Sequence, residues 1–243
     1  MKKLLYTSLV ALTLGASACT VADIQRTVDG VVAGTGGAAV TRNEVASGLK
    51  QALEVGITKG SNQASQTDGY YKNSLIRIPF PPDVQKVENT LRQVGLGKEV
   101  DRFVMTLNRG AEDAAKSAVP IFVNAIKQMS IADAWGILKG DKDAATQYLK
   151  RTTSTQLQTA FMPVIQKSLE KTNATRYYTD LVTQYNQIPM VQKVNPNLDE
   201  YATQKAMDGL FLLVAQEEAN IRENPIARTT ELLRRVFAKE NQS

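Results

Sequence analysis

The sequence of 243 residues contains no histidine and only one cysteine, Cys19. The missing histidine excludes His-based general base catalysis, the Ser-His-Asp triad and every metal site that uses an imidazole ligand. A single cysteine excludes an intramolecular disulfide. An enzyme built from this chain would therefore depend on carboxylate, lysine, tyrosine, serine or arginine side chains.

Signatures of nucleotide and nucleic-acid binding are also missing. The nearest approach to a phosphate-binding loop, residues 34–37, is too short and is not followed by Lys-Ser or Lys-Thr. No run of Lys or Arg exceeds two residues, and the formal charge of +5 includes Lys2 and Lys3. The sequence therefore predicts no nucleic-acid partner, and we expect neither a cofactor nor a metal.

The first eighteen residues have the three-part layout of a secretory signal peptide. Lys2 and Lys3 give a positive start, residues 4–14 are uncharged and strongly apolar, and small residues lead to Cys19. The apolar run of about eleven residues is shorter than the roughly 20 that a spanning helix needs. Residues 1–18 are therefore predicted to be a signal peptide that is removed.

Two cleavage sites overlap before Cys19. Ala16-Ser17-Ala18 suits the general signal peptidase, and Ala16 to Cys19 resembles a bacterial lipobox, although leucine is commoner at its first position. A lone thiol in an exported protein needs a role, and lipidation with a fatty acid such as palmitate supplies one. The alternative is general cleavage that leaves an incidental thiol.

This interpretation predicts an exported protein anchored to a membrane of the cell envelope by lipid on Cys19. Residues 19–40, with glycines crowded towards their end, are predicted to be a flexible lipidated tether. Thr20, rather than aspartate, follows the cysteine. By resemblance to the sorting rule of Gram-negative lipoproteins, this favours the outer membrane, facing the periplasm.

From Thr41 onward, apolar residues recur at helical spacing. Capping boxes at Thr41 and Ser130, and a cap at Asn197, mark helix starts. The pattern predicts an all-α fold over residues 41–240: a single multi-helix, bundle-like domain of about eight helices. Expected boundaries are a loop at 59–69, separate helices at 143–150 and 154–171, a helix at 197–223, and a last helix from 225. One extended or edge-strand segment is expected near residues 75–79, because nearby prolines exclude a central strand.

One candidate polar site lies on the helix around residues 108–113. Arg109 and Asp113, and likewise Asn108 and Glu112, are four residues apart and are predicted to pair. The group is either a binding patch or an exposed helix face with local ion pairs, which contribute little.

A second group, Glu217 to Asn224, ends the most apolar helix. Glu218 precedes Arg222 by four residues, which is the favourable order for an ion pair. A pair of carboxylates here could raise one pKa and act as an acid or base, or the group could form a network that holds the last two helices. Asp68 and Tyr70 mark a turn whose aromatic rings line either a groove or the core.

These segments resemble a bacterial family catalogued as domain of unknown function 4197, over about residues 44–238. The resemblance is carried by Asp68-Gly69-Tyr70 with Ile78-Pro79, Asn108-Arg109 with Ala111-Glu112, Met129 with Asp133, Ile137-Leu138-Lys139-Gly140, Ala144-Ala145-Thr146 with Tyr148, Asp208-Gly209-Leu210-Phe211, and Glu217-Glu218 with Ile221-Arg222 and Asn224-Pro225. It implies an all-helical envelope protein and no particular activity. It also directs attention to one set of polar residues as a candidate site: Asp68, Tyr70, Asn108, Arg109, Glu112, Glu217, Glu218, Arg222 and Asn224.

Three functions remain open from the sequence. The leading hypothesis is a non-enzymatic envelope protein, tethered by lipid, that binds a partner protein, a lipid or a small ligand. The second is a carboxylate-dependent hydrolase, which requires Glu112 to converge with Glu217 or Glu218 in one cleft. The third is a carrier of lipid or another small ligand, which requires an apolar cavity among the helices.

Overall fold

A computed structural model describes residues 41–187, 189–190 and 192–223 of the chain. Cys19, Asn224 and the expected last helix lie outside these residues. The elements in chain order are α2 (Arg42–Ser65), the 3₁₀ turn η1 (Pro82–Val84), α3 (Gln85–Gln93), α4 (Gly97–Ala115), α5 (Ala118–Gln128), α6 (Ile131–Lys139), α7 (Ala144–Glu170), α8 (Ala174–Asn186) and α9 (Leu198–Glu223). Eight α-helices and no strand in the described part of the chain confirm the all-α, eight-helix prediction.

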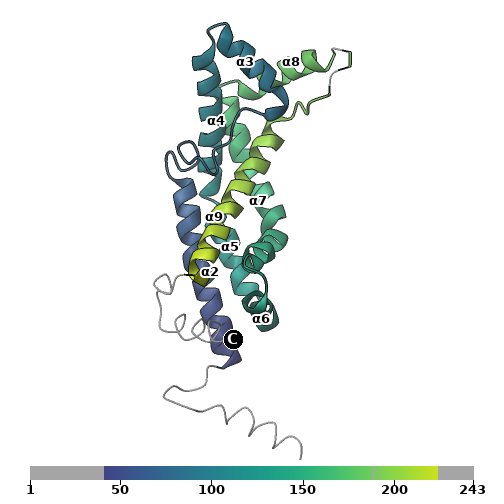
Figure 1. Cartoon of the computed structure of the whole chain (residues 1–243). Helices are drawn as coiled ribbons and strands as arrows, with labels where there is room; N and C mark the ends of the chain where they lie inside the picture. Colours follow the sequence, from purple (N-terminus) through teal and green to yellow (C-terminus); the bar gives the residue numbers. More distant parts are fainter. Residues whose placement is uncertain (1–40, 188, 191, 224–243) are drawn as a thin grey trace, which may run out of the picture. The chain divides into compact units, whose positions relative to one another are not determined.

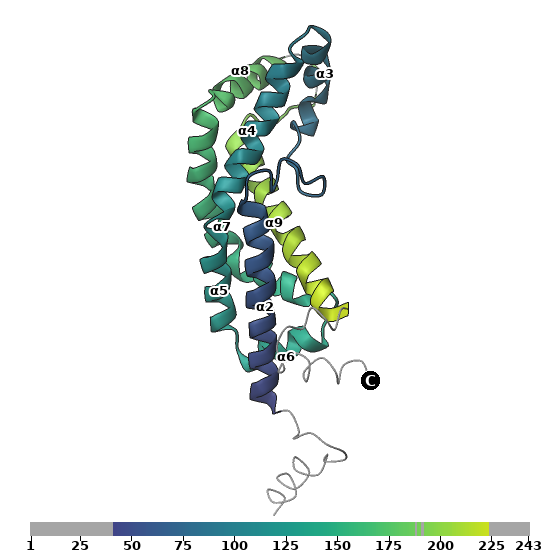
Figure 2. The same ribbon diagram turned by 90° about the vertical axis from the view of Figure 1, so that its left-hand side faces the viewer.

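Four long helices, α2, α4, α7 and α9, form the centre of the bundle, and α5 packs against α2 and α7. Helices α2 and α9 are antiparallel: a Cβ on Gly60 would lie 3.6 Å from Leu213, and one on Gly56 would lie 3.1 Å from Ile221. In both views α3 and α8 lie at one end of the described helices and α6 at the other (Figures 1 and 2). None of the described helices combines the length and apolarity that a membrane-spanning helix requires.

The predicted start of α2 is confirmed, but its predicted end is wrong. Thr41 Oγ1 accepts a hydrogen bond from the Glu44 N–H, and Glu44 Oε2 accepts one from the Thr41 N–H. The helix then continues to Ser65 through most of the region expected to be a loop. Small residues there allow α9 to approach closely, and Ser61 and Ala64 are fully buried. Burial against α9 therefore outweighs the polar character of this stretch.

Helix α7 is one continuous helix, and the predicted break between residues 150 and 154 is wrong. The threonines at the expected break donate their hydroxyl hydrogens to carbonyls one turn earlier, Thr152 to Tyr148 and Thr153 to Leu149. These bonds satisfy the polar side chains within the helix, so the β-branched stretch does not interrupt it.

Of the two forms expected near residues 75–79, extended or edge strand, the edge strand is wrong, because residues 74–76 form a turn and residues 77–79 have no regular structure. The buried side-chain amide of Asn108 supplies what a neighbouring strand would have supplied. Its Oδ1 accepts from the Ile78 N–H at 2.8 Å, and its Nδ2 donates to the Ile78 carbonyl at 2.8 Å. One side chain on α4 thus satisfies both main-chain groups of Ile78.

Candidate functional site

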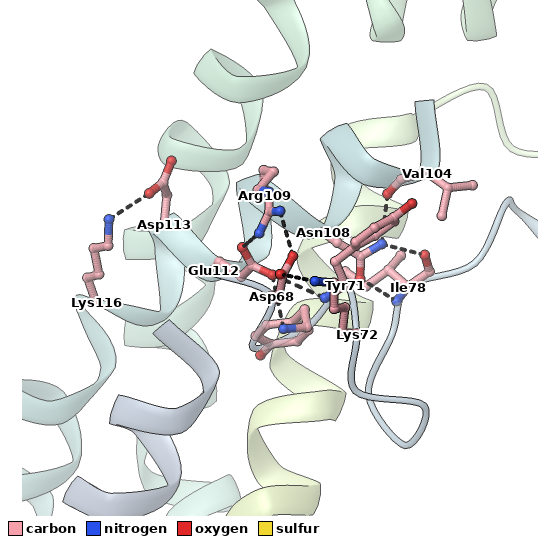
Figure 3. A network of polar contacts seen from close by, with 11 residues as sticks. Asp68, Tyr71, Lys72, Ile78, Val104, Asn108, Arg109, Glu112, Asp113 and Lys116 are labelled. Atoms are coloured by element: carbon pink, nitrogen blue, oxygen red, sulfur yellow. Dashed lines mark hydrogen bonds and ion pairs between the residues drawn. The ribbon is translucent and has the colours of Figure 1, made fainter. Parts of the chain in front are cut away.

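A buried carboxylate on α4, Glu112, holds the loop that follows α2 (Figure 3). Only 3% of Glu112 is exposed. Its Oε1 accepts hydrogen bonds from the N–H groups of Tyr70 and Tyr71, both at 3.1 Å, and its Oε2 accepts from Arg109 at 2.6 Å. Arg109 also donates to Asp68 at 2.6 Å. We call these five residues the Glu112 network.

The backbone of the loop is shaped to reach Glu112. Asp68 has a φ of 69°, in the left-handed region that aspartate tolerates better than most residues. The hydrogen bonds of Asp68 with Lys72 and Arg109 lower the pKa of its carboxyl below its ordinary value. The turn therefore carries a carboxylate held in its charged form at neutral pH.

Replacing Gly69 by alanine should destabilise the protein by about 2 kcal/mol, as expected for overpacking. A Cβ at this position would lie 2.3 Å from the Gln63 carbonyl oxygen and 2.5 Å from that of Ala64. Both are backbone atoms of α2, so the loop must shift away from α2, which disturbs the neighbouring N–H of Tyr70 that binds Glu112. Chemical denaturation measures the loss. Gly136→Ala, at a helical site where a Cβ would meet nothing within 4 Å, should be neutral or stabilising, and an equal loss there would contradict the explanation.

Tyr70 links the loop to α9. It is fully buried, and its hydroxyl donates to the Ala206 carbonyl at 2.6 Å. A Cβ on Gly209 would lie 2.9 Å from the Tyr70 ring, so glycine permits the close approach. Burial, reinforced by the charge of Glu112, raises the pKa of the Tyr70 phenol far above its ordinary value. The phenol therefore remains a neutral hydrogen-bond donor.

A second buried carboxylate, Glu218 on α9, caps the first turn of α7. It is 4% exposed and accepts from the N–H groups of Ala145 and Thr146 at 2.9 and 2.8 Å, and from the Thr146 hydroxyl at 2.7 Å. Arg222 donates to Glu218 and also to the carbonyl of Ile137, at the end of α6. The side chain of Asp143, which precedes α7, makes no cap bond. A residue from α9 thus performs the capping in its place.

The predicted pairs within residues 108–113 are wrong. Arg109 pairs with Glu112 and not with Asp113, which instead pairs with Lys116, and Asn108 binds the main chain of Ile78. Arg109 is three residues from Glu112 and pairs with it at that spacing. The side chain of Asn108 is engaged by the main chain of Ile78 and is not available to Glu112.

In the second group, Glu217 to Asn224, the predicted ion pair is present. The pair of Glu218 with Arg222 is confirmed. Glu217, mostly buried, pairs with Lys59 at 2.7 Å. Its partner belongs to α2, so Glu217 is separate from the contacts of Glu218.

The candidate polar residues do not converge on one centre. Tyr70, held by Glu112, packs on Gly209, and Glu218 lies nine residues further along α9, which is about 14 Å at 1.5 Å per residue. Glu112, Glu217 and Glu218 also bind different partners, so these contacts give no support to the convergence that a hydrolase requires. Among the residues that the structure describes, no group of three or more Asp, Glu, Cys or His side chains is placed to hold a metal ion.

An apolar pocket of about 530 Å³ lies at the end of the bundle where α3, α4 and α8 meet. Its lining residues are Phe80, Leu91, Leu96, Glu99, Val100, Arg102, Phe103, Thr106, Thr172, Ala174, Tyr177, Tyr178 and Leu181. We call it the α3–α4–α8 pocket. None of the candidate polar residues lines it, so the sequence candidates did not include this pocket.

The rim of the pocket exposes apolar surface, because α3 covers it loosely. No residue of α3 is fully buried. Leu96, on the connection to α4, is 42% exposed, and Tyr177 on α8 is 67% exposed. Val84, Val87, Leu91 and Val94 recur at helical spacing in the sequence, but an apolar stripe of this kind ordinarily indicates a core-facing helix. Only the tertiary structure shows that little of it reaches the core.

Three aromatic rings form the inner wall of the pocket. The centroids of Phe80 and Phe103 are 5.0 Å apart, and those of Phe103 and Tyr178 are 6.4 Å apart. Burial, with a smaller effect from the nearby charge of Asp83, raises the pKa of Tyr178 to about 12. The wall is thus apolar and keeps its one phenol neutral, which suits a hydrocarbon ligand rather than a charged one.

We expect Tyr178 to ionise near pH 12 in the folded protein, instead of near 10. A raised pKa in the folded state means that the unfolded chain loses the proton first, so stability should fall as pH rises from 10 through 12. Phenolate absorbance and denaturation at each pH measure this. Tyr178→Phe, which loses only a long bond to the Asn195 carbonyl, should reduce the fall. An unchanged pH profile in that variant would contradict the assignment.

Fold and sites together define an all-helical domain held by two buried Glu–Arg networks, with an apolar pocket at one end. The chain belongs to the family described as Protein of unknown function (DUF4197), whose model matches residues 39–238. Comparison with curated proteins and with solved structures finds no match. The polar motifs that suggested this family fall largely within the two networks and their partners, so their role in this chain is to hold helices and loops together.

Proposed function

We propose that the protein is a lipid-anchored cell-envelope protein whose helical domain binds the hydrocarbon chain of a lipid in the α3–α4–α8 pocket. The main support for this proposal is the size and lining of the pocket. Its volume of about 530 Å³ lies within the roughly 300–1,000 Å³ typical of small-molecule sites. Its wall is mostly aliphatic and aromatic, and its two charged residues, Glu99 and Arg102, are exposed. This combination suits a chain that enters tail first.

The expected affinity follows from the apolar surface that such a chain would bury. Each methylene contributes about 0.8 kcal/mol, so about ten buried methylenes contribute roughly 8 kcal/mol. That gross figure corresponds to a Kd of about 1 μM, and the costs of association weaken the affinity, so the Kd should lie above this value. Binding in the micromolar range would suffice to hold a single-chain lipid that is exchanged rather than stored.

The membrane anchor would supply such ligands. A lipid on Cys19 would keep the domain beside a membrane, where hydrocarbon chains are the most abundant apolar molecules. Within the described helices, the chain enters at Thr41, at the end near α6, whereas the pocket lies at the end formed by α3 and α8 (Figures 1 and 2). The attachment point of the tether therefore does not block the pocket.

A binding role also agrees with the chemistry of the conspicuous carboxylates. Both oxygens of Glu112 and both of Glu218 are engaged by N–H groups and arginine. A general acid or base needs a proton site that faces its substrate. The geometry therefore favours the binding hypothesis over the hydrolase hypothesis.

A fluorescent analogue of a single-chain fatty acid should bind the folded protein with a Kd above about 1 μM. Leu91→Glu and Leu181→Glu each place a charge on a wall of the pocket and should weaken binding at least tenfold. Both side chains are only half-buried, so the fold should survive. Val55→Glu makes the same change at an exposed position of α2 and should leave Kd unchanged. Failure of the wild-type protein to bind, or equal weakening by Val55→Glu, would refute the pocket assignment.

The anchor is tested separately by the mass of the mature N-terminus. A diacylglyceryl-modified Cys19 would support the lipoprotein assignment. A free thiol there, or a chain that retains residues 1–18, would overturn it, whatever the outcome of the binding experiment.

A further inference from the structure

The mouth of the α3–α4–α8 pocket carries two opposite charges, Glu99 and Arg102, which are its only charged lining residues. Both project from α4, three residues apart, so they are neighbours on one helix face. Both are exposed, whereas the adjoining Val100 is buried. The charged pair thus sits where the pocket meets solvent.

Neither charge is neutralised within the part of the chain that the structure describes. Glu99 and Arg102 are not within 4.0 Å of each other or of another opposite charge there. Nearby, by contrast, Arg92 joins Glu88 to Asp101 at 2.9 Å. Glu99 lies in the first turn of α4, where the positive end of the helix favours a carboxylate. The mouth therefore offers one anionic and one cationic group to a bound molecule.

We infer that the ligand of this pocket is a single-chain amphiphile whose zwitterionic head group is bound at the pocket mouth by Glu99 and Arg102. This inference rests on the proposed function. The apolar wall would take the hydrocarbon chain, and the cost of burying charge keeps the head group outside. Arg102 binds the phosphate or carboxylate of the head group, and Glu99 binds its ammonium group. A fatty acid anion would meet repulsion from Glu99, a cationic amphiphile repulsion from Arg102, and a neutral head group would leave both unpaired.

The preference should be modest and sensitive to salt. Exposed ion pairs are worth little individually. Arg102 meets the phosphate of either head group, so the single contact of Glu99 with the ammonium group should favour the zwitterion over an anionic head group on the same chain by about twofold to fivefold. The preference should shrink as ionic strength rises, because the charges face solvent. The contribution of the hydrocarbon chain to the affinity should not shrink with salt. Measurements at several ionic strengths therefore distinguish chain binding from head-group binding.

The test measures displacement of the fluorescent fatty-acid analogue by three monomeric lipids with the same acyl chain: a lysophospholipid with a phosphoethanolamine head, one with a phosphoglycerol head, and a monoacylglycerol. The wild-type protein should bind the first most tightly. Glu99→Gln should abolish discrimination against the phosphoglycerol head, and Arg102→Gln should weaken both phosphate-bearing lipids relative to the monoacylglycerol. Lys98→Gln, an exposed charge on α4 that does not line the pocket, should change neither ratio.

The outcomes separate the two proposals. If none of the three lipids displaces the probe, the pocket does not bind lipid chains and the proposed function fails. If all three displace it equally, or if Lys98→Gln alters the ratios as much as the two variants at the mouth, chain binding stands and head-group recognition by Glu99 and Arg102 is overturned.

Discussion

Replacing Glu218 by alanine is expected to lower the free energy of unfolding by about 3–5 kcal/mol, as expected when one partner of a buried ion pair is removed. The change removes the carboxylate that Arg222 contacts at 3.0 Å, at a position that is only 4% exposed. The N–H groups of Ala145 and Thr146 lose their acceptors at the start of α7. Because α7 packs against both α4 and α9, its first turn cannot loosen without disturbing the centre of the bundle.

Chemical denaturation measures the loss, and hydrogen exchange locates it. The amides of the first turn of α7 should exchange faster in Glu218→Ala than in the wild-type protein. Glu218→Gln keeps an acceptor oxygen but loses the charge, so it should fall between the two. Glu223→Ala, which removes an exposed carboxylate from the same helix, should change stability by less than about 0.5 kcal/mol. A loss below about 1 kcal/mol in Glu218→Ala would show that the cap is not structural.

Local signals in the sequence predicted most of the fold. Capping boxes depend on residues three apart, and both boxes, at Thr41 and at Ser130, form as predicted. Helical periodicity likewise depends on neighbours within two turns. Predictions failed where a distant part of the chain supplied the decisive contact. The burial of Ala64 by α9 extends α2, and Asn108 of α4 replaces the expected strand partner of Ile78.

The same distinction applies to the sites. Glu218 was identified as one of a polar group, and its pair with Arg222 could be predicted from their spacing, but its capping of α7 joins residues more than seventy apart in sequence. The α3–α4–α8 pocket is assembled from three helices and was not predictable at all. Periodicity shows that a helix such as α3 has an apolar face, but not whether another element fills the space in front of that face.

The two networks and the pocket divide the bundle into parts of different rigidity. Buried carboxylates connect α4 to the loop after α2, and α9 to α6 and α7. The pocket end has no such connection in the described residues: Arg92 and Asp101, on α3 and α4, are both exposed. Exposed pairs of this kind contribute little, so α3 is held mainly by partial apolar contact. Ligand entry would therefore disturb the part of the domain that is least costly to move.

Replacing Glu112 by alanine should also cost about 3–5 kcal/mol of stability. Its carboxylate is the acceptor for two successive main-chain N–H groups, of Tyr70 and Tyr71, and for Arg109. Water cannot easily take its place, since the side chain is only 4% exposed. The loop after α2 should be held less firmly at Tyr70 and Tyr71, and the contact of Tyr70 with α9 should loosen. The Arg109–Asp68 pair and the bonds of Asn108 to Ile78 would still join the loop to α4.

A double-mutant cycle with Arg109 distinguishes a network from a set of independent contacts. Arg109→Ala alone should cost less than Glu112→Ala, because Arg109 is about one-third exposed and leaves the two N–H bonds intact. The double variant should be more stable than the sum of the single losses implies, by about 0.5–3 kcal/mol. Arg109→Ala leaves the buried carboxylate of Glu112 without its cation, and Glu112→Ala leaves Arg109 with Asp68 alone. Asp113→Ala, beside Glu112 but paired only with exposed Lys116, is the matched control and should be nearly neutral. Strictly additive losses would show that Glu112 and Arg109 act separately. A coupling energy in this range would show that the ion pair and the two N–H bonds act together in holding this part of the loop on α4.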